Sequence, residues 1–208
     1  RKRSVASTRW LARQLNDPYV LQAKAGGYRS RAAFKLVQLD DKHHFLKKGA
    51  RVVDLGSAPG GWLQVAAERI GPGGKIVGID LLPIDPVSGA ETIEGDFLAE
   101  DAPMRLAVLL GGTADIVLSD MAPSTTGHAR TDHLRLMGLI EAAYDFAVHI
   151  LEKNGTFVAK VFQGGAEAEL LARMKRDFAT VKHVKPDSSR RESREIFVIA
   201  RNFKGRSV

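Results

Sequence analysis

The chain has 208 residues, of which 44% are hydrophobic and 26% charged, and it contains no cysteine. This composition supports a folded domain with a core, and the lack of cysteine excludes disulfides and thiolate metal sites. No apolar stretch reaches the roughly 20 residues of a membrane-spanning helix. The basic N-terminus also lacks the apolar run of a signal peptide, so we expect a cytoplasmic protein without membrane contact.

Charge is distributed unevenly along the chain. The formal net charge is +7, with +9 in residues 1–50, −7 in residues 51–180 and +5 in residues 181–208. An acidic middle between two basic ends predicts that the ends bind a polyanion, nucleic acid above all. The candidate contacts are Lys2, Arg3, Arg9, Arg13, Lys24, Arg29 and Arg31 on the N-terminal side and Lys182, Lys185, Arg190, Arg191 and Arg194 on the C-terminal side.

The first 50 residues precede the first expected strand. Their pattern predicts helices over residues 8–15 and 30–43, joined through Gly26-Gly27. The second helix carries apolar residues that can pack on a sheet. We therefore interpret residues 1–50 as a basic helical extension of one domain, whose main part is residues 51–208.

From residue 51 onward, apolar strands alternate with helical segments. Such alternation predicts an α/β fold with a mostly parallel sheet covered by helices on both faces. The last two strands are joined by a polar loop and read as a hairpin, which makes one edge of this seven-stranded sheet antiparallel. Strands are expected at 51–56, 75–80, 92–96, 114–120, 156–162, 181–184 and 196–200, and helices at 62–70, 103–110, 133–151 and 166–178.

Acidic residues recur where these strands end. In open α/β sheets, ligands bind beyond the carboxyl ends of the strands. Glycines in the segment after the first strand permit a tight turn and a close approach of the backbone to a ligand. We expect a carboxylate on the second strand to accept hydrogen bonds from ribose hydroxyls. The aspartates are Asp54, Asp80, Asp96 and Asp120, and the glycines are Gly56, Gly60 and Gly61.

A dinucleotide and S-adenosylmethionine are the two competing ligands for this edge of the sheet. The dinucleotide fingerprint G-x-G-x-x-G binds a pyrophosphate, but Ala58 replaces its second glycine and the aspartates would repel phosphate. S-adenosylmethionine has a ribose, an adenine, a sulfonium cation and no phosphate. We therefore predict a Rossmann-like fold that binds S-adenosylmethionine.

Several charged residues lie in segments that otherwise read as buried. Lys160 interrupts the apolar run of residues 156–162, and an isolated buried ammonium is costly, so it needs partners. Asp120 ends the preceding strand and can approach it. Glu195 opens the last strand, and Lys35 lies beside Phe34 in the N-terminal helix. Periodicity alone does not assemble these four residues into one site.

Five motifs, in order along nearly the whole chain, resemble the FtsJ-type ribosomal RNA 2′-O-methyltransferases. Within this family the chain is most similar to the bacterial heat-shock members, which methylate a uridine in the A-loop of large-subunit rRNA. It departs from their first motif at Ser57, where alanine is common. The motifs are Ser30-Arg-Ala-Ala-Phe-Lys-Leu36, Asp54-Leu-Gly-Ser-Ala-Pro-Gly-Gly-Trp62, Ser119-Asp-Met-Ala-Pro123, Val161-Phe-Gln-Gly164 and Lys185-Pro-Asp-Ser-Ser-Arg190 with Ser193-Arg-Glu195.

The resemblance implies an enzyme that transfers a methyl group from S-adenosylmethionine to a ribose 2′-hydroxyl without a metal. The implied partner is large-subunit rRNA, most naturally within the assembled large ribosomal subunit, and nothing requires more than a monomer. The implied catalytic tetrad is Lys35, Asp120, Lys160 and Glu195, and the implied cofactor contacts are Gly60, Trp62, Asp80, Asp96 and Asp120.

Three alternatives keep the fold but change the function. A related 2′-O-methyltransferase would act on a tRNA anticodon loop or an mRNA cap. A non-catalytic ribosome-assembly factor would retain the fold without the chemistry, although an intact tetrad argues against it. A small-molecule methyltransferase would not need the basic ends of the chain.

Overall fold

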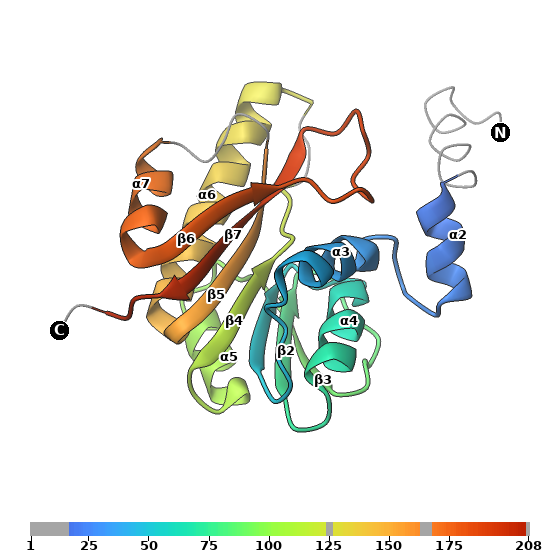
Figure 1. Cartoon of the computed structure of the whole chain (residues 1–208), viewed down its shortest axis with the longest axis horizontal. Helices are drawn as coiled ribbons and strands as arrows, with labels where there is room; N and C mark the ends of the chain where they lie inside the picture. The colour runs from blue at the N-terminus through green and yellow to red at the C-terminus, as the bar shows by residue number, and fades with distance from the viewer. Residues whose placement is uncertain (1–16, 124–126, 163–167, 207–208) are drawn as a thin grey trace.

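The computed structural model describes residues 17–123, 127–162 and 168–206 (Figure 1). The expected helix at 8–15, the first residues of the expected helix at 166–178 and the candidate contacts Lys2, Arg3, Arg9 and Arg13 lie outside these ranges. In chain order the elements are α2 (Pro18–Ala25), α3 (Ala33–His43), β1 (Arg51–Leu55), α4 (Gly61–Ile70), β2 (Lys75–Asp80), β3 (Ala90–Glu94), α5 (Ala102–Leu110), β4 (Ala114–Ser119), α6 (Ala129–Ile150), β5 (Leu151–Phe162), α7 (Ala168–Asp177), β6 (Phe178–Val184) and β7 (Glu195–Phe203).

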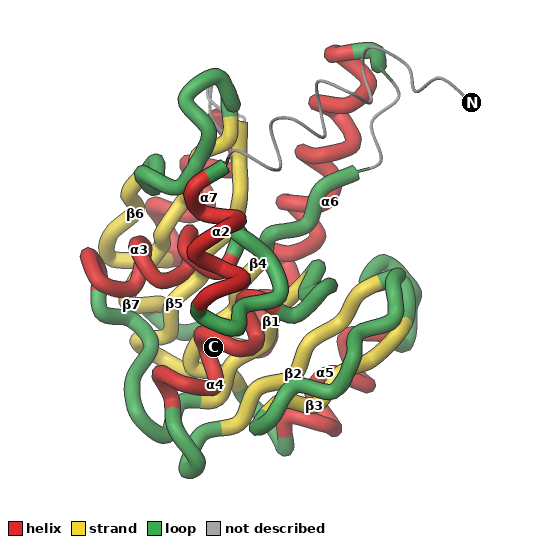
Figure 2. Tube along the Cα trace, turned by 90° about the vertical axis from the view of Figure 1, so that its right-hand side faces the viewer, coloured by secondary structure: helices red, strands yellow, loops and turns green. Residues whose placement is uncertain are grey.

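The strands form one seven-stranded sheet in the order β3-β2-β1-β4-β5-β7-β6. The pairs among β1 to β5 are parallel, whereas β7 is antiparallel to both β5 and β6. The expected mostly parallel sheet with antiparallel pairing at one edge is confirmed. Within that edge, β7 is inserted between β5 and the outermost strand β6, because the hairpin folds back toward the centre of the sheet. The twist of the sheet is visible in Figure 2.

Two hydrophobic layers cover the two faces of the sheet. On one face, buried side chains of α5, α6 and α7 pack against the strands, with Tyr144 and Phe157 among the largest. On the other face, α3 and α4 contribute Leu36, Leu39 and Leu63 to a second cluster that contains Val158 and Phe197. The central strands carry apolar side chains on both faces of the sheet, so both faces must be covered by helices.

The N-terminal extension contains one predicted helix and one helix that the sequence pattern did not predict. Helix α3 lies within the range expected for the second helix and packs on the sheet through Leu36 and Leu39. Helix α2 was not predicted, because its side chains show no apolar stripe and only Ala23 is buried. Asp17 caps its N-terminus and Gly26 follows its end. Figure 1 shows α2 at the side of the molecule, outside α3 and α4.

Two element boundaries differ from expectation around residue 151. The expected helix at 133–151 and strand at 156–162 leave Asn154-Gly155 between them, but α6 already starts at Ala129 and ends at Ile150, and β5 starts at Leu151. The β4–β5 register shifts here, from Ala114 opposite Leu151 to Ile116 opposite Thr156, and this shift accommodates the turn-forming pair within the strand. Helices of the described ranges are too short or too polar to cross a lipid bilayer.

Candidate active site

The turn after β1 brings the backbone close to the end of β4. Gly56 has φ of +78°, a left-handed conformation that favours glycine. A Cβ atom at Gly56 would lie 2.7 Å from Cγ of Met121 and 2.9 Å from its Cα. Glycine is therefore required here both for the backbone conformation and for the close approach of the segment after β4.

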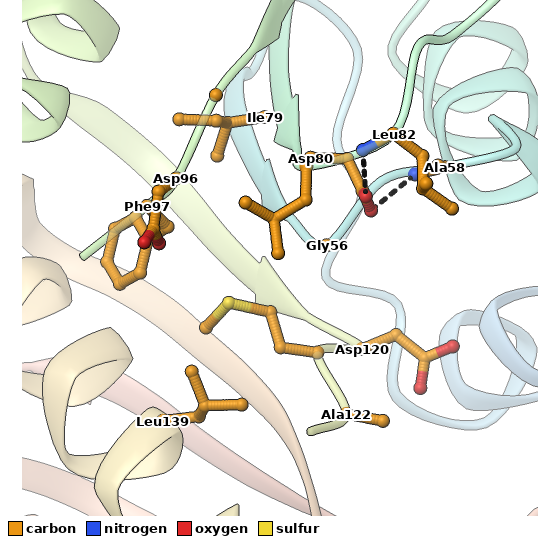
Figure 3. A pocket seen from close by; sticks show the side chains of 13 residues that line it. Gly56, Ala58, Ile79, Asp80, Leu82, Asp96, Phe97, Asp120, Ala122 and Leu139 are labelled. Atoms are coloured by element: carbon orange, nitrogen blue, oxygen red, sulfur yellow. Dashed lines mark hydrogen bonds between the residues drawn. The ribbon is translucent and has the colours of Figure 1, made fainter. Parts of the chain in front are cut away.

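A pocket of about 300 Å³ opens beyond the carboxyl ends of β1, β2 and β4 (Figure 3). Its acidic residues are Asp80, Asp96 and Asp120, of which Asp120 directs its carboxylate away from the other two (Figure 3), and its apolar wall includes Ile79, Phe97 and Leu139. Parallel strands end at this same edge, which explains why aspartates from different strands gather there.

The carboxylates of the pocket are held in place by backbone amides. Asp80 accepts hydrogen bonds from the N–H groups of Ala58 and Leu82, both at 2.9 Å (Figure 3). Asp96 accepts one from the N–H group of Leu98 at 2.9 Å, which leaves its second oxygen available. Each bonded oxygen keeps a further lone pair, so the pocket presents several acceptors for hydroxyl or amino donors.

The composition of the pocket fits S-adenosylmethionine better than a dinucleotide. Within the described residues, no lysine or arginine lines it, so it offers no cationic partner for a pyrophosphate. Three carboxylates beside an apolar wall suit a nucleoside that carries a sulfonium cation. The residues present therefore fit the expected ligand, with carboxylates available for its hydroxyl and amino groups and the apolar residues Phe97 and Ile79 in the same pocket.

Asp54 lies beneath this pocket as a buried carboxyl group. Its side chain is 0% exposed, and neither oxygen has a hydrogen-bond partner among the described residues. Burial raises the pKa of Asp54 well above its usual range, and the nearby Asp120 and Asp80 raise it further. An acidic group without partners at the end of a central strand is costly for folding alone.

Gly60, Gly61 and Trp62 are predicted to contact the cofactor, but their side-chain positions face other parts of the protein instead of the pocket. The Trp62 side chain is 3% exposed and packs against Phe197, and its indole N–H donates to the Ala32 carbonyl at 2.8 Å. A Cβ atom at Gly60 would meet Nη1 of Arg29 at 3.0 Å, and one at Gly61 would meet Oγ of Ser30 at 2.8 Å. Trp62 is therefore a packing residue, and any cofactor contact of these three must come from their backbone.

The first of two ion pairs joins the ends of β4 and β5. The Nζ atom of Lys160 lies 3.1 Å from Oδ1 of Asp120 and donates to the Asp120 carbonyl at 3.0 Å. Lys160 is 8% exposed, so its ammonium is held almost entirely by this residue. Asp120 also lines the pocket, which places Lys160 directly behind one wall of it.

The second ion pair joins α3 to the start of β7. The Nζ atom of Lys35 lies 2.5 Å from Oε1 of Glu195 and 5.7 Å from the centre of the Phe197 ring. The hydroxyl of Ser189 donates to the same oxygen of Glu195 at 3.3 Å. The loop before β7 therefore positions Glu195 from one side and helix α3 positions it from the other.

Strand register explains why the two ion pairs lie on the same face. Lys160 is opposite Phe197 and Phe162 is opposite Glu195 in the antiparallel β5–β7 pair. Opposite residues share a face, as do residues two apart on one strand, so Lys160, Phe197 and Glu195 all point toward α3. Glu195 pairs with Lys35, whereas Lys160 pairs with Asp120. The structure thus brings the four predicted residues together as two neighbouring pairs.

A second cavity, of about 350 Å³, lies on the Lys35 side of these pairs. Lys35 and Glu195 line it together with Arg31, Arg190 and Ser193. One pair thus contributes Asp120 to the acidic, partly apolar pocket, and the other lines a cavity that carries three basic and two acidic side chains.

Several predicted RNA-binding residues make internal contacts instead. The Arg29 guanidinium donates to the carbonyls of Pro59, Asp85 and Pro86 at 3.1, 2.5 and 2.6 Å. Arg31 pairs with Asp17 and donates to the Ser188 carbonyl. Of the remaining candidates, Arg190 lies 3.8 Å from Asp17, Lys185 donates to the carbonyls of Arg191 and Ser193, and Lys24, Lys182, Arg191 and Arg194 are exposed.

The sequence pattern did not identify Arg29 and Asp17 as structural parts of the site. Arg29 connects the segment before α3 to both loops that flank the pocket. Its partner Pro59 is next to the pocket residue Ala58, and its partner Asp85 lies in the same loop as the pocket residue Leu82. Asp17 holds two arginines beside the second cavity. Arg29 bonds to carbonyl groups, and Asp17 pairs with arginines, that lie far away in the sequence. No local sequence pattern therefore predicts these contacts.

The fold and the pocket, together with the matching family model, define a class: a Rossmann-like methyltransferase that uses S-adenosylmethionine. The chain belongs to the FtsJ-like methyltransferase family, whose model matches residues 28–203.

Relatives of known name support the same assignment. The chain is 59% identical to the ribosomal RNA large subunit methyltransferase E of Paramagnetospirillum magneticum, over 100% of this chain and 87% of the relative. It is 61% identical to the protein of that name from Granulibacter bethesdensis, over 98% of this chain and 88% of the relative.

Solved structures give the same picture. A crystal structure described as a ribosomal RNA methyltransferase from Plasmodium falciparum is 34% identical, with a TM-score of 0.75 over 86% of this chain and all of the other. Aeropyrum pernix fibrillarin, solved with bound S-adenosylmethionine, is 20% identical, with a TM-score of 0.56 over 83% of this chain and 75% of the other. The second likeness concerns the fold alone.

Proposed function

We propose that this protein transfers a methyl group from S-adenosylmethionine to a ribose 2′-hydroxyl of large-subunit ribosomal RNA. The target we propose is a uridine in the A-loop, presented within the assembled large subunit to a monomeric enzyme in the cytoplasm. Residues 1–50 act in this proposal as a basic extension of the catalytic domain, residues 51–208, rather than as a separate domain.

The observation that carries the proposal is the ion pair of Lys160 with Asp120, a residue that lines the acidic pocket. Asp120 reaches from Lys160 to the acidic pocket, and the neighbouring Lys35–Glu195 pair lines the basic cavity. A ribose hydroxyl that enters from the basic cavity meets a lysine before it meets the methyl donor. The names of the large-subunit methyltransferases that are about 60% identical favour rRNA as the polymer that enters.

Each member of the tetrad has a distinct task in this mechanism. Bound S-adenosylmethionine supplies a methyl group already activated by its positive sulfonium. Lys160 orients the acceptor hydroxyl and, as the neutral amine, receives its proton to become an ammonium, while Asp120 holds the Lys160 side chain through two contacts of about 3 Å. Glu195 fixes Lys35, which binds the acceptor strand in the basic cavity. Alignment of the reacting groups by these rigid pairs accounts for much of the rate.

Two substitutions at Lys160 test this mechanism. Lys160→Ala removes the proton acceptor, and Lys160→Arg keeps the positive charge but cannot serve as a base. We expect both to lower the single-turnover rate of methyl transfer by about 10²–10⁴-fold, the usual contribution of a general base. The affinity for S-adenosylmethionine, measured by calorimetry, should stay close to that of the unsubstituted protein.

Lys175→Ala on α7 is the matched control, because Lys175 is an exposed lysine on the opposite face of the sheet. It should change neither the rate nor the affinity. An active Lys160→Arg protein would show that the charge alone matters. Equal losses of rate and cofactor affinity in Lys160→Ala would make Lys160 a structural residue and contradict the proposal.

A further inference from the structure

A basic groove lies at the end of the sheet opposite the active site. It has a volume of about 420 Å³ and is lined by Lys47, Lys48, Lys153 and Arg201, together with Asn154 and Asn202. These residues come from the loop before β1, the start of β5 and the end of β7. The groove is separate from both cavities of the active site, since no lining residue is shared.

The positive charge of this region extends beyond the groove. His43, at the end of α3, lies close enough to Lys42, Lys182 and Arg201 for their charges to lower its pKa, in addition to the larger effect of burial. Arg201 is thus shared by the groove and by this second group of cations. We call the whole set the distal basic surface: Lys42, Lys47, Lys48, Lys153, Lys182 and Arg201.

Most of these cations are not neutralised by the protein. Among the described residues, Lys42, Lys47, Lys153, Lys182 and Arg201 form no ion pair. The one acidic residue of the groove, Asp115, accepts a hydrogen bond from the backbone N–H of Arg51 at 2.7 Å. Nearby acidic side chains of α3 are also engaged, because Asp40 and Asp41 bind Arg69.

The backbone of the groove presents amide side chains beside these cations. Asn154 and Asn202 have φ of +71° and +57°, and His44, next to the groove residue Phe45, has φ of +51°. These are the non-glycine residues with left-handed φ in the described chain. Both asparagines are exposed, so their amides can donate to an acceptor that also contacts the lysines.

Two elements run from the active site to the distal basic surface. Helix α3 carries Lys35 near its start and ends at His43. Strand β7 begins with Glu195 and reaches Arg201 six residues later, a span of about 20 Å at the rise of a β-strand. An extended polyanion can therefore contact both places on one molecule, whereas a small methyl acceptor cannot.

We propose that the distal basic surface binds the phosphate backbone of the RNA that flanks the methylated nucleotide. This inference rests on the proposed function, because the RNA must also reach Lys160. The active site takes the acceptor ribose, and the distal basic surface holds a neighbouring RNA segment by charge, with no sequence reading. Such contacts position a substrate and release counterions from it.

The test removes two exposed charges that do not touch the active site. Lys47→Gln/Lys153→Gln is compared with the control Arg105→Gln/Lys175→Gln, which removes two exposed cations from α5 and α7 on the opposite face. Binding to protein-free large-subunit rRNA is measured at several salt concentrations. We expect the slope of log K against log salt to fall by about one for each phosphate that is no longer neutralised, and the affinity to weaken about tenfold at low salt.

The other readouts separate this surface from the catalytic machinery. The affinity for S-adenosylmethionine and the rate at saturating RNA should match those of the control. A salt slope equal to that of the control would overturn the inference. Weaker binding to assembled subunits with unchanged binding to protein-free rRNA would also overturn it, since the surface would then contact a ribosomal protein. Failure of the unsubstituted protein to bind rRNA would instead contradict the proposed function.

Discussion

At the scale of single residues, the site contains two ionisable side chains, Lys160 and Asp54, at buried positions that a hydrophobic core normally fills with apolar residues. Lys160 is buried but paired with Asp120 through both a carboxylate and a carbonyl. Asp54 is buried without a partner for either oxygen in the described structure. The first arrangement is satisfied within the protein, while the second is not, so the two residues should respond differently to pH and substitution.

Asp54→Asn should stabilise the protein increasingly as pH rises. Because burial raises the pKa of Asp54, the folded state keeps a proton that the unfolded state loses near pH 4. The wild-type carboxyl therefore costs stability progressively as pH rises above that value toward its folded pKa. Asparagine does not ionise, so the two proteins should be close in stability at pH 4 and diverge above it, as measured by urea denaturation.

The same substitution has a functional consequence if the carboxylate serves the cofactor. We expect Asp54→Asn to bind S-adenosylmethionine more weakly, because the nearby sulfonium cation favours the ionised form of Asp54 and asparagine cannot ionise. Asp145→Asn, on the exposed surface of α6, is a control for the removal of one carboxylate. A stability difference that does not change between pH 4 and pH 8 would contradict this interpretation of Asp54.

Single residues also show how far the sequence predicts the site. Lys160 is visible in the sequence, because a lysine in an otherwise apolar strand demands a partner. Glu195 cannot be identified in this way, because its position in the site depends on β7 pairing with β5 even though β6 comes between them in the chain. The resemblance to the family supplied that residue. The sequence does not predict that the Trp62 side chain packs against Phe197, so that a cofactor contact of Trp62 would have to come from its backbone.

At the scale of elements, the pocket depends on how its loops are attached to the N-terminal segment. Arg29 donates three hydrogen bonds to backbone carbonyls in the two loops that follow β1 and β2. Glycine at position 60 leaves room for the guanidinium, which would lie 3.0 Å from a Cβ atom there. Arg29 is therefore a positioning residue that fixes the mouth of the cofactor pocket.

Arg29→Lys should weaken the use of S-adenosylmethionine while sparing the chemical step. A lysine ammonium cannot bridge three carbonyls in the geometry of a guanidinium fork. Loss of one or two hydrogen bonds, at about 1 kcal/mol each, corresponds to a rise of roughly tenfold in the KM for S-adenosylmethionine. The kcat at saturating cofactor should change by much less, as measured by steady-state methyl transfer.

Arg69→Lys is the matched control for Arg29→Lys. Arg69 bonds Asp40 and Asp41 between α4 and α3, away from the pocket. Its substitution should lower the melting temperature with no change in the KM for S-adenosylmethionine. A fall of kcat with no change of KM in Arg29→Lys would show that Arg29 does not position the pocket.

Most helices and strands were predictable from the sequence. The elements that were not predictable lack the apolar runs or stripes on which such a prediction depends. The central strands have apolar runs and their helices have apolar stripes, so their order and type followed directly. Helix α2 was missed because it buries only Ala23 and has no stripe. The start of β5 was misplaced because Asn154-Gly155 resembles a helix stop, although tertiary pairing with β4 extends the strand through it.

At the scale of the whole molecule, the fold gathers acidic residues in one pocket and basic residues on other surfaces. The acidic middle of the sequence becomes the cofactor pocket, whose described lining carries three aspartates and no basic side chain. The basic ends contribute Arg31 and Arg190 to the second cavity and Lys47 and Arg201 to the distal groove. The sequence predicted a polyanionic ligand. It did not predict that several of the basic residues expected to bind this ligand instead make contacts within the protein, because those contacts join segments that are distant in the sequence.

Mapping the methylated nucleotide tests the central claim most directly. Labelled S-adenosylmethionine is offered with large ribosomal subunits from cells that lack the enzyme, with protein-free rRNA and with bulk tRNA. We predict label on one A-loop ribose of the large subunit, dependent on Lys160. Label on tRNA would keep the mechanism but contradict the proposed substrate, and absence of label from all three acceptors despite bound cofactor would contradict the assignment of this site as an RNA methyltransferase.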